Sequence, residues 1–352
     1  MTSTTILAID LGKYKCVSCA YDRATTAAEF RTATTSRAEV ERLIRAARPA
    51  VVVIEACTLA GWVSDLCGEL GVPVKVANTA AEAWKYKHAK RKTDRDDALR
   101  LAQLEALGQL PTIVVPAKAV REWRALIAHR QSLVTQRVAA QNRIRAVLVG
   151  QGLPAPRGAK AWAAAGLAGI AQFARPLADC APDELWRGLL ELALTAYRQA
   201  EELVVAAEAK LDEIGTADAR VRLLDTVPGL GPRTAEAVVA HLDDPRRFKS
   251  GKQVSAYGGL VPRQFQSGED DRRGHITKRG PSVLRKLLVQ CAWCMLRYNR
   301  WARAVFDRLS RGKARRKQAV VALARRVLVR CWAMLRDNQP WRADPAPAAT
   351  AA

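Results

Sequence analysis

The sequence has no long apolar run and comparatively few negative charges. Of its 352 residues 49% are hydrophobic, yet no apolar stretch reaches the ~18 residues that a membrane span requires. Acidic residues number 34 against 57 lysines and arginines, which gives a net charge of +23. The first absence argues against a membrane-spanning protein. The second favours a polyanionic partner, most simply nucleic acid, over an inert basic surface.

The chain also lacks the marks of secretion. Its first residues, Met-Thr-Ser-Thr-Thr, form neither a basic region nor a long apolar one. We therefore expect a cytoplasmic, nucleoid-associated protein whose eight cysteines are reduced thiols. Cys16/Cys19 and Cys291/Cys294 have the spacing of zinc ligands, but neither pair has a glycine-rich knuckle around it. Core packing is the favoured interpretation for both pairs.

Apolar runs alternate with amphipathic stretches through residues 1–112. Three runs with short connections predict an antiparallel meander, and two later β-branched runs predict buried strands separated by helices. The strands are expected at 5–11, 16–21, 29–34, 51–54 and 72–76. We predict an α/β domain with a mixed sheet and helices on its faces.

Carboxylates stand where two of these strands end. Asp10 ends the first strand and Glu55 follows the fourth. If the two strands are neighbours, both side chains reach the same sheet edge, where α/β folds place their sites. Oxygen ligands gathered there are suited to Mg²⁺.

The stretch Lys90–Ala98 can complete such a site. Three cations precede three acids in it, and on a helix Asp94 and Asp97 share a face while Asp96 points away to solvent. Four carboxylates would hold two ions for phosphoryl transfer. Taken alone, the stretch is most simply explained as a helix start capped by Thr93 or Asp94.

Residues 113–215 predict a helical arm. Apolar spacings of three and four after Pro116 indicate a helix of about thirty residues. A linker with little fixed structure is expected over Gly150–Gly169, and a second long helix over Asp183–Ile214. Two long helices suggest an antiparallel hairpin or coiled coil that dimerises, with an ordinary helical core as the alternative.

Residues 216–338 predict a basic, mainly helical domain that opens with a helix-hairpin-helix. Pro228-Gly-Leu-Gly231 precedes a helix that starts near Arg233. In such a motif Gly229 and Gly231 let the backbone approach phosphate, and the helix N-terminus binds it. These contacts read no sequence. The alternative is a tight turn between helices.

A polar loop is predicted over Gln264–Gly280. Four cations surround the Ser267-Gly268 dipeptide, namely Arg272, Arg273, Lys278 and Arg279. A serine on a cationic loop can attack a phosphodiester, because the cations stabilise the developing charge. From the residues alone a plain turn explains Ser267 as well, and Ser250 and Ser255 remain other candidates.

The helices from Ser282 to about Arg336 are strongly basic. Residues 311–317 carry five cations and no acid, among them Arg315, Arg316 and Lys317. Aromatic residues interleave with these arginines, which fits base stacking or an aromatic core; they are Trp293, Tyr298, Trp301 and Trp332. Residues 339–352 are expected to form a disordered tail.

Three motifs resemble the DEDD transposases of bacterial insertion sequences, in the family numbered one hundred and ten. They are Ile9–Lys13, Ile54–Cys57 and Lys92–Ala98, and the pattern around Ala256–Pro262 resembles the C-terminal domain of the same family. The resemblance implies a ribonuclease-H-like first domain, similar to a Holliday-junction resolvase. It implies that Asp10, Glu55, Asp94 and Asp97 bind Mg²⁺ or Mn²⁺, and that Ser267 forms a phosphoserine link to DNA. Lys92 is then a phosphate contact.

The same resemblance implies the partners of the chain. They are donor and target DNA, a noncoding guide RNA that delegates sequence choice to base pairing, and further copies of the chain in a dimer or tetramer. Two alternatives stay open: a metal-dependent junction resolvase or nuclease without a covalent intermediate, and a non-catalytic nucleic-acid binder.

Overall fold

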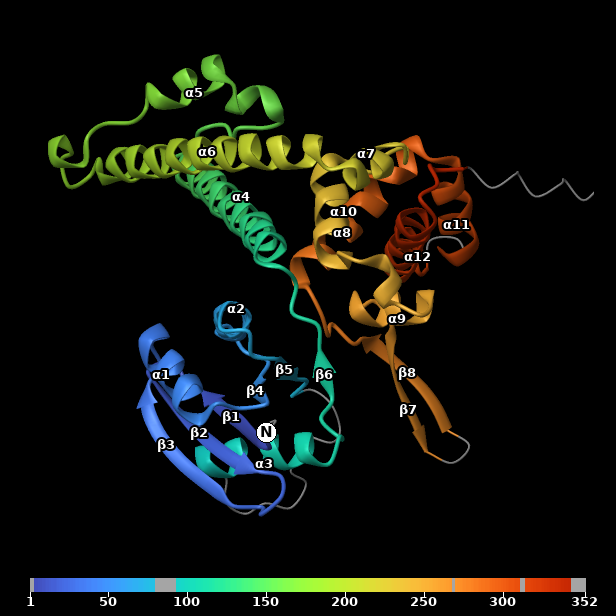
Figure 1. Cartoon of the computed structure of the whole chain (residues 1–352). Coiled ribbons are helices and arrows are strands. Elements are labelled where there is room, and N and C mark those ends of the chain that lie inside the picture. Colours follow the sequence, from blue (N-terminus) through green and yellow to red (C-terminus); the bar gives the residue numbers. More distant parts are fainter. Residues whose placement is uncertain (1–2, 80–92, 268–269, 311–313, 343–352) are drawn as a thin grey trace, which may run out of the picture. The chain divides into compact units, whose positions relative to one another are not determined.

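The chain forms two compact units, Met1–Arg121 and Glu122–Ala352 (Figure 1). This computed structural model describes residues 3–79, 93–267, 270–310 and 314–342. No helix among these residues has the length and apolar character needed to cross a membrane.

A six-stranded mixed sheet forms the centre of the first unit. Its strands are β1 (Thr5–Leu11), β2 (Lys15–Asp22), β3 (Ala28–Thr34), β4 (Val51–Glu55), β5 (Val74–Ala77) and β6 (Thr112–Ile113), in the order β3-β2-β1-β4-β5-β6. The first three strands are an antiparallel meander, and β4 and β5 continue the sheet parallel to β1. The predicted mixed sheet is confirmed. The short antiparallel strand β6 was not predicted, because two exposed residues carry no alternation.

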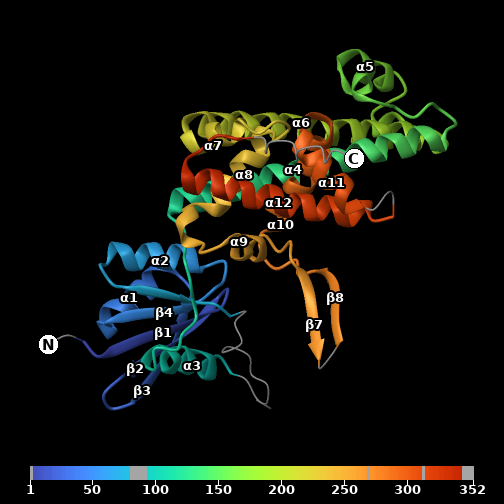
Figure 2. The ribbon, with the colours of Figure 1, turned by 90° about the vertical axis from the view of Figure 1, so that its right-hand side faces the viewer.

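Helices cover both faces of this sheet, as predicted. Successive strand residues point to opposite faces, so Leu7 and Ile9 pack against α1 (Arg37–Ala47) and α2 (Ala60–Glu69). Ile6 and Ala8 pack against α3 (Asp94–Ala106) on the other face (Figure 2). The side chain of Ser36 caps α1 as expected, by accepting a hydrogen bond from the Glu39 N–H.

The second unit is helical around one large core. Its main helices are α4 (Lys118–Gly150), which begins in the first unit, α5 (Ala164–Ala171), α6 (Leu185–Ala217), α7 (Ala219–Asp225), α8 (Pro232–Leu242), α9 (Gly251–Tyr257), α10 (Ser282–Tyr298), α11 (Arg300–Ser310) and α12 (Arg316–Asp337). Buried side chains of α7, α8, α10, α11 and α12 form a single cluster. Trp332 belongs to it, and its indole N–H donates to the Pro245 carbonyl.

The two long helices α4 and α6 run antiparallel. Arg137 of α4 bonds to Glu201 of α6 at 2.8 Å. Arg130 lies seven residues earlier in α4 and pairs with Glu208, which lies seven residues later in α6. The expected unstructured linker between them is wrong in part, because α5 and a 3₁₀ turn, Ala159–Trp162, lie within it. Trp162 anchors the turn by packing on Tyr197 with ring centroids 5.1 Å apart.

Two other segments are more ordered than predicted. The supposed loop contains an antiparallel hairpin of β7 (Pro262–Ser267) and β8 (Asp270–Ile276). After α12 the chain folds back, and the N–H of Trp341 donates to the Thr226 hydroxyl at 3.0 Å. Order thus extends into the expected tail as far as Arg342, and residues 343–352 lie outside the described part.

Candidate functional site

Asp10 and Glu55 lie side by side at one edge of the central sheet. Strands β1 and β4 are parallel neighbours with Ile9 paired to Ile54. Asp10 and Glu55 each follow one of these isoleucines, so they lie next to each other. Asp10 continues the face of Ile6 and Ala8, which α3 covers. Glu55 raises the pKa of Asp10, as a carboxyl group close beside it does. The predicted convergence of the strand ends is therefore present.

The start of α3 divides three acidic residues between two roles. Asp96 forms a capping box with Thr93: its carboxylate accepts from the Thr93 N–H at 3.0 Å, and its own N–H donates to the Thr93 hydroxyl at 3.3 Å. Asp94 and Asp97 are thereby left for the sheet edge, and both raise the pKa of Asp10 electrostatically. Asp96 was expected to be merely solvated; it is exposed but caps the helix.

The pKa of Asp10 reflects its burial and its acidic neighbours. Burial, the neighbouring Glu55 carboxyl group and the charges of Asp94 and Asp97 together raise the pKa of Asp10 from 3.8 to about 7, burial being the largest cause. Like charges held together in a half-buried place favour the neutral acid or a bound cation. Among the described residues, no three His, Cys, Asp or Glu side chains are gathered tightly enough to chelate an ion as they stand. Chelation would therefore require these side chains to turn inward.

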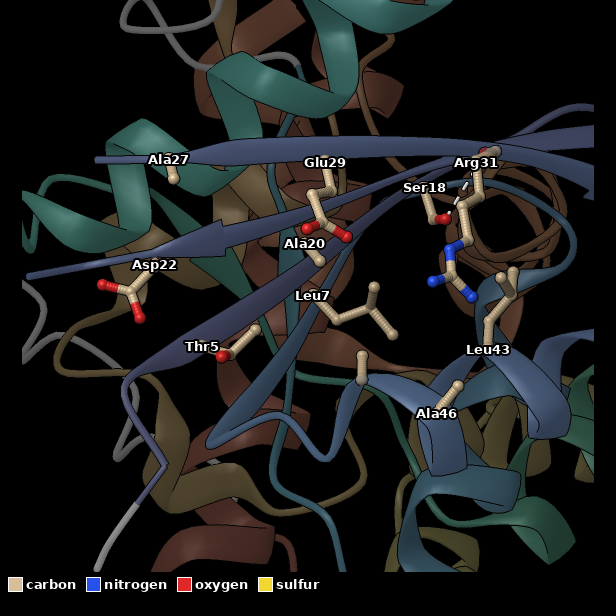
Figure 3. A pocket seen from close by; sticks show the side chains of 11 residues that line it. Thr5, Leu7, Ser18, Ala20, Asp22, Ala27, Glu29, Arg31, Leu43 and Ala46 are labelled. Carbon is tan, nitrogen blue, oxygen red and sulfur yellow. Dashed lines mark hydrogen bonds between the residues drawn. The ribbon is translucent and has the colours of Figure 1, made fainter. Parts of the chain in front are cut away.

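A separate hollow lies on the other face of the sheet. It measures about 270 Å³ between the outer strands and α1, and its lining includes Asp22, Glu29 and Arg31 opposite Leu43 (Figure 3). Thr5 and Leu7 reach it from β1, so it opens on the face opposite to Asp10. It does not belong to the acidic cluster.

The segment predicted to form the hairpin motif lies between α7 and α8. Gly229 has a positive φ of 85°, and a Cβ there would lie 3.1 Å from the Cα of Met295, so this glycine is needed for packing. Gly231 caps α8, and the space around its Cα is open. Arg233 pairs with Asp212 and, at 3.1 Å, with Glu236. Its guanidinium is thus held within the unit.

The backbone of Ser267 ends strand β7 opposite Asp270. The side chains of Ser267, Arg272 and Arg273 lie outside what the structure describes, as does Lys92. Lys278 and Arg279 are exposed at the base of the hairpin. There the chain crosses itself closely, since a Cβ on Gly280 would lie 1.9 Å from the Tyr257 carbonyl oxygen.

The other two serines have different surroundings. Ser255 is buried within α9 and donates its hydroxyl proton to the Gly251 carbonyl at 2.7 Å. Ser250 stands at the start of α9, and its side chain makes no capping bond there.

The basic C-terminal helices present some of the predicted contacts to solvent. Arg315, Arg316 and Lys317 are exposed, and the Arg316 guanidinium lies 5.9 Å from the ring of Trp293. Trp341, which was not predicted to belong to this region, packs on Trp301 with ring centroids 5.3 Å apart. A tryptophan inside a supposed tail was the available signal.

Two protein-family models match separate parts of the chain. Residues 7–151, which contain the four carboxylates, match a DEDD transposase model. Residues 221–307, from α7 to α11, match the model described as "Transposase IS116/IS110/IS902 family". The first match defines the class of protein, a transposase with a DEDD domain.

Relatives extend this likeness over most of the length. A Pseudomonas aeruginosa protein named "Probable family 20 transposase" is 32% identical over 313 residues, 87% of this chain and 90% of that one. The transposase of insertion sequence element IS1111A from Coxiella burnetii is 29% identical over 97% and 92% of the two chains. The chain belongs to the IS116/IS110/IS902 family of transposases, and is thus an enzyme of DNA recombination.

A solved structure is also similar, though only weakly. It is Thermus thermophilus RuvC in complex with a Holliday junction substrate, with a TM-score of 0.25 and 17% identity over 31% of this chain and 99% of that chain. The family assignment rests on the sequence matches.

Proposed function

We propose that this transposase cuts and rejoins DNA with a divalent-metal site of four carboxylates and a serine nucleophile. The observation that carries the metal site is the meeting of Asp10 and Glu55, with Asp94 and Asp97 close enough to raise the pKa of Asp10. The choice of Ser267 as the nucleophile is supported by its position within the matched C-terminal region.

The four carboxylates have the donor chemistry for Mg²⁺ or Mn²⁺. All their ligand atoms are hard oxygens, and the repulsion that raises the pKa of Asp10 is relieved when a cation sits between them. When bound, the ions would supply Lewis-acid stabilisation of charge on the scissile phosphate. Asp10 and Glu55 would hold them from rigid strands, and Asp94 and Asp97 from the first turn of α3.

The serine step conserves the phosphodiester bond energy. The Ser267 Oγ would form a bond to phosphorus while the bond from phosphorus to one sugar oxygen breaks. The hydroxyl proton of Ser267 leaves the serine, and one proton is taken up by the departing sugar oxygen. A hydroxyl of the partner strand then reverses the step and releases the serine, so no water is consumed.

The surroundings of the alternatives favour Ser267. Ser255 is buried and bonded within α9, so attack would require that helix to open. Ser267 lies at the far end of a hairpin that extends beyond the helices of its unit (Figure 2). Exposed Lys278 and Arg279 stand at the base of this hairpin, where they would hold the DNA backbone.

The chain is further proposed to act as a homo-oligomer. Helix α6 exposes leucines at heptad-like spacing, a pattern that pairs helices; they are Leu185, Leu189, Leu192 and Leu203. A second copy on this face would make a dimer or, in pairs, a tetramer. Replacing Leu189 and Leu192 with glutamate is expected to yield monomers by light scattering.

A noncoding RNA is proposed to choose donor and target. The large positive charge supports a second polyanion beside DNA, and the backbone contacts proposed at the Gly231 turn read no base. Donor and target plasmids should therefore recombine only when RNA transcribed from the flanks of the element is added. Recombination without any RNA would contradict the proposed guide RNA but would not contradict the proposed metal site and serine nucleophile.

One experiment separates the proposed chemistry from simple hydrolysis. Strand cleavage is measured for Asp10→Ala and Ser267→Ala with Mg²⁺ and a donor-end substrate. The proposal expects both variants to lose cleavage. A nuclease that uses water would lose it in Asp10→Ala only, and a non-catalytic binder would show no cleavage in the unchanged protein.

A further inference from the structure

A basic hollow lies between α11 and α12 of the second unit. Trp301 lines it from α11, and Arg325, Arg326, Val329 and Arg330 line it from α12, around a volume of about 390 Å³. The α12 residues form two i, i+4 pairs, so they share one face of the helix. Three guanidinium groups therefore reach one hollow within little more than a helical turn.

Two of the three arginines stand out by their lack of protein partners in the described part of the chain. Within the described residues, Arg325 and Arg326 take part in no hydrogen bond or ion pair. Burial lowers the pKa of Arg326, and the charges of Arg308 and Arg325 lower it further. Crowded cations in a partly desolvated place destabilise the fold unless an anion joins them.

Aromatic rings hold the third guanidinium in a fixed orientation. Arg330 lies 4.7 Å from the Trp301 ring and 4.3 Å from the Trp341 ring. It also donates to the Arg342 carbonyl at 3.0 Å. Trp341 is itself tied to Thr226. Cation–π contacts of this kind hold a guanidinium plane in place, so the wall of the hollow is formed before a ligand arrives.

We propose that this hollow binds the phosphodiester backbone of a nucleic-acid strand. Arg325 and Arg326 would contact phosphate oxygens, since the guanidinium fork matches two of them at once. Arg330, between the indole rings of Trp301 and Trp341, would add electrostatic attraction for the phosphate. The inference rests on the proposed action on nucleic acid, but on neither the carboxylates nor Ser267. DNA and RNA share this backbone, and the test distinguishes them.

The test measures binding in EDTA, where no strand is cut. Affinities for labelled duplex DNA and for labelled single-stranded RNA are measured against salt concentration, for the unchanged protein and for R325Q/R326Q. The matched control is R42Q/R45Q, which removes the same charge from exposed arginines of α1. A conservative variant, R325K/R326K, restores the charge, and circular dichroism checks each fold.

The proposal expects R325Q/R326Q to weaken one probe on the order of tenfold and to reduce the slope of log K against log salt by about 2. The probe affected identifies the strand, DNA or RNA. R42Q/R45Q should leave the slope unchanged, and R325K/R326K should recover most of it. Equal losses in both glutamine variants, or an unchanged slope for both probes, would overturn the proposal. Because cleavage is absent from the assay, a failed nucleophile or metal site would not alter its outcome.

Discussion

Asp10 and Glu55 lie at the ends of two neighbouring parallel strands, close enough for Glu55 to raise the pKa of Asp10. Two carboxyl groups held so close together favour the state in which one of them keeps its proton. Burial and the neighbouring carboxylates raise the pKa of Asp10 to about 7, so near neutrality this proton is easily lost. The proposed metal site would therefore release this proton when a cation binds.

Replacement of Asp10 by asparagine is therefore expected to stabilise the metal-free protein above neutrality. The Asp10 pKa is raised in the folded state, so the stability contributed by its protonated form is complete below about 3.8 and is lost as the pH rises through about 7. In EDTA at pH 8, Asp10→Asn should raise the unfolding midpoint by a few degrees, and less at pH 5. Calorimetry from pH 4 to 8 measures this. A difference that does not vary with pH would contradict it.

Asp97→Asn and Asp96→Asn form a matched pair within one helical turn. Asp97 is buried toward Asp10, whereas Asp96 caps the helix. Asp97→Asn should reduce strand cleavage at least about a hundredfold, as expected for loss of a ligand or its partner. Asp96→Asn should cost about 1 kcal/mol of stability and leave cleavage intact. Equal cleavage losses would mean that the turn, not the ligand position, matters.

The sequence was sufficient to predict that the strand ends carrying Asp10 and Glu55 meet, but not the segments around Ser267. The apolar runs predicted the two strands, and the ends of these strands predicted the positions of Asp10 and Glu55. This works because the register of a buried parallel pair of strands follows from the apolar pattern. The β7–β8 hairpin was taken for a loop, since Arg, Gln and Asp obscure the alternation expected of a strand. The fold-back to Trp341 depends on contacts with Thr226 and Trp301, which no local pattern reveals.

Gly280→Ala is expected to abolish recombination by disturbing the base of the hairpin. Its Cβ would lie 1.9 Å from the Tyr257 carbonyl oxygen, at a φ of 108°. Gly152→Ala is the control, because Gly152 also has a positive φ of 70° but has open space around it. Only the first variant should lose recombination in the plasmid assay. Both variants should retain the stabilisation of the first unit by Mg²⁺. If Gly152→Ala were equally inactive, backbone strain alone would explain the effect.

Gly231→Ala and Gly229→Ala separate phosphate contact from packing. A methyl group fits at Gly231 without touching other atoms, whereas at Gly229 it meets Met295 under a positive φ. Gly231→Ala should lower the thermal midpoint only slightly, because alanine caps a helix less well than glycine, but it should weaken DNA binding a few-fold by obstructing approach to the start of α8. Gly229→Ala should lower the midpoint. Unchanged DNA affinity in Gly231→Ala would leave the turn with a packing role only.

The most direct measurement is the identification of a covalent link between the protein and DNA. Labelled donor DNA is incubated with the protein, Mg²⁺ and flank RNA, the protein is denatured, and the modified peptide is sequenced by mass spectrometry. The account predicts a nucleotide phosphate on Ser267, absent in Ser267→Ala and in Asp10→Asn. Cleaved DNA without any adduct, or an adduct on Ser250 that persists in Ser267→Ala, would contradict it.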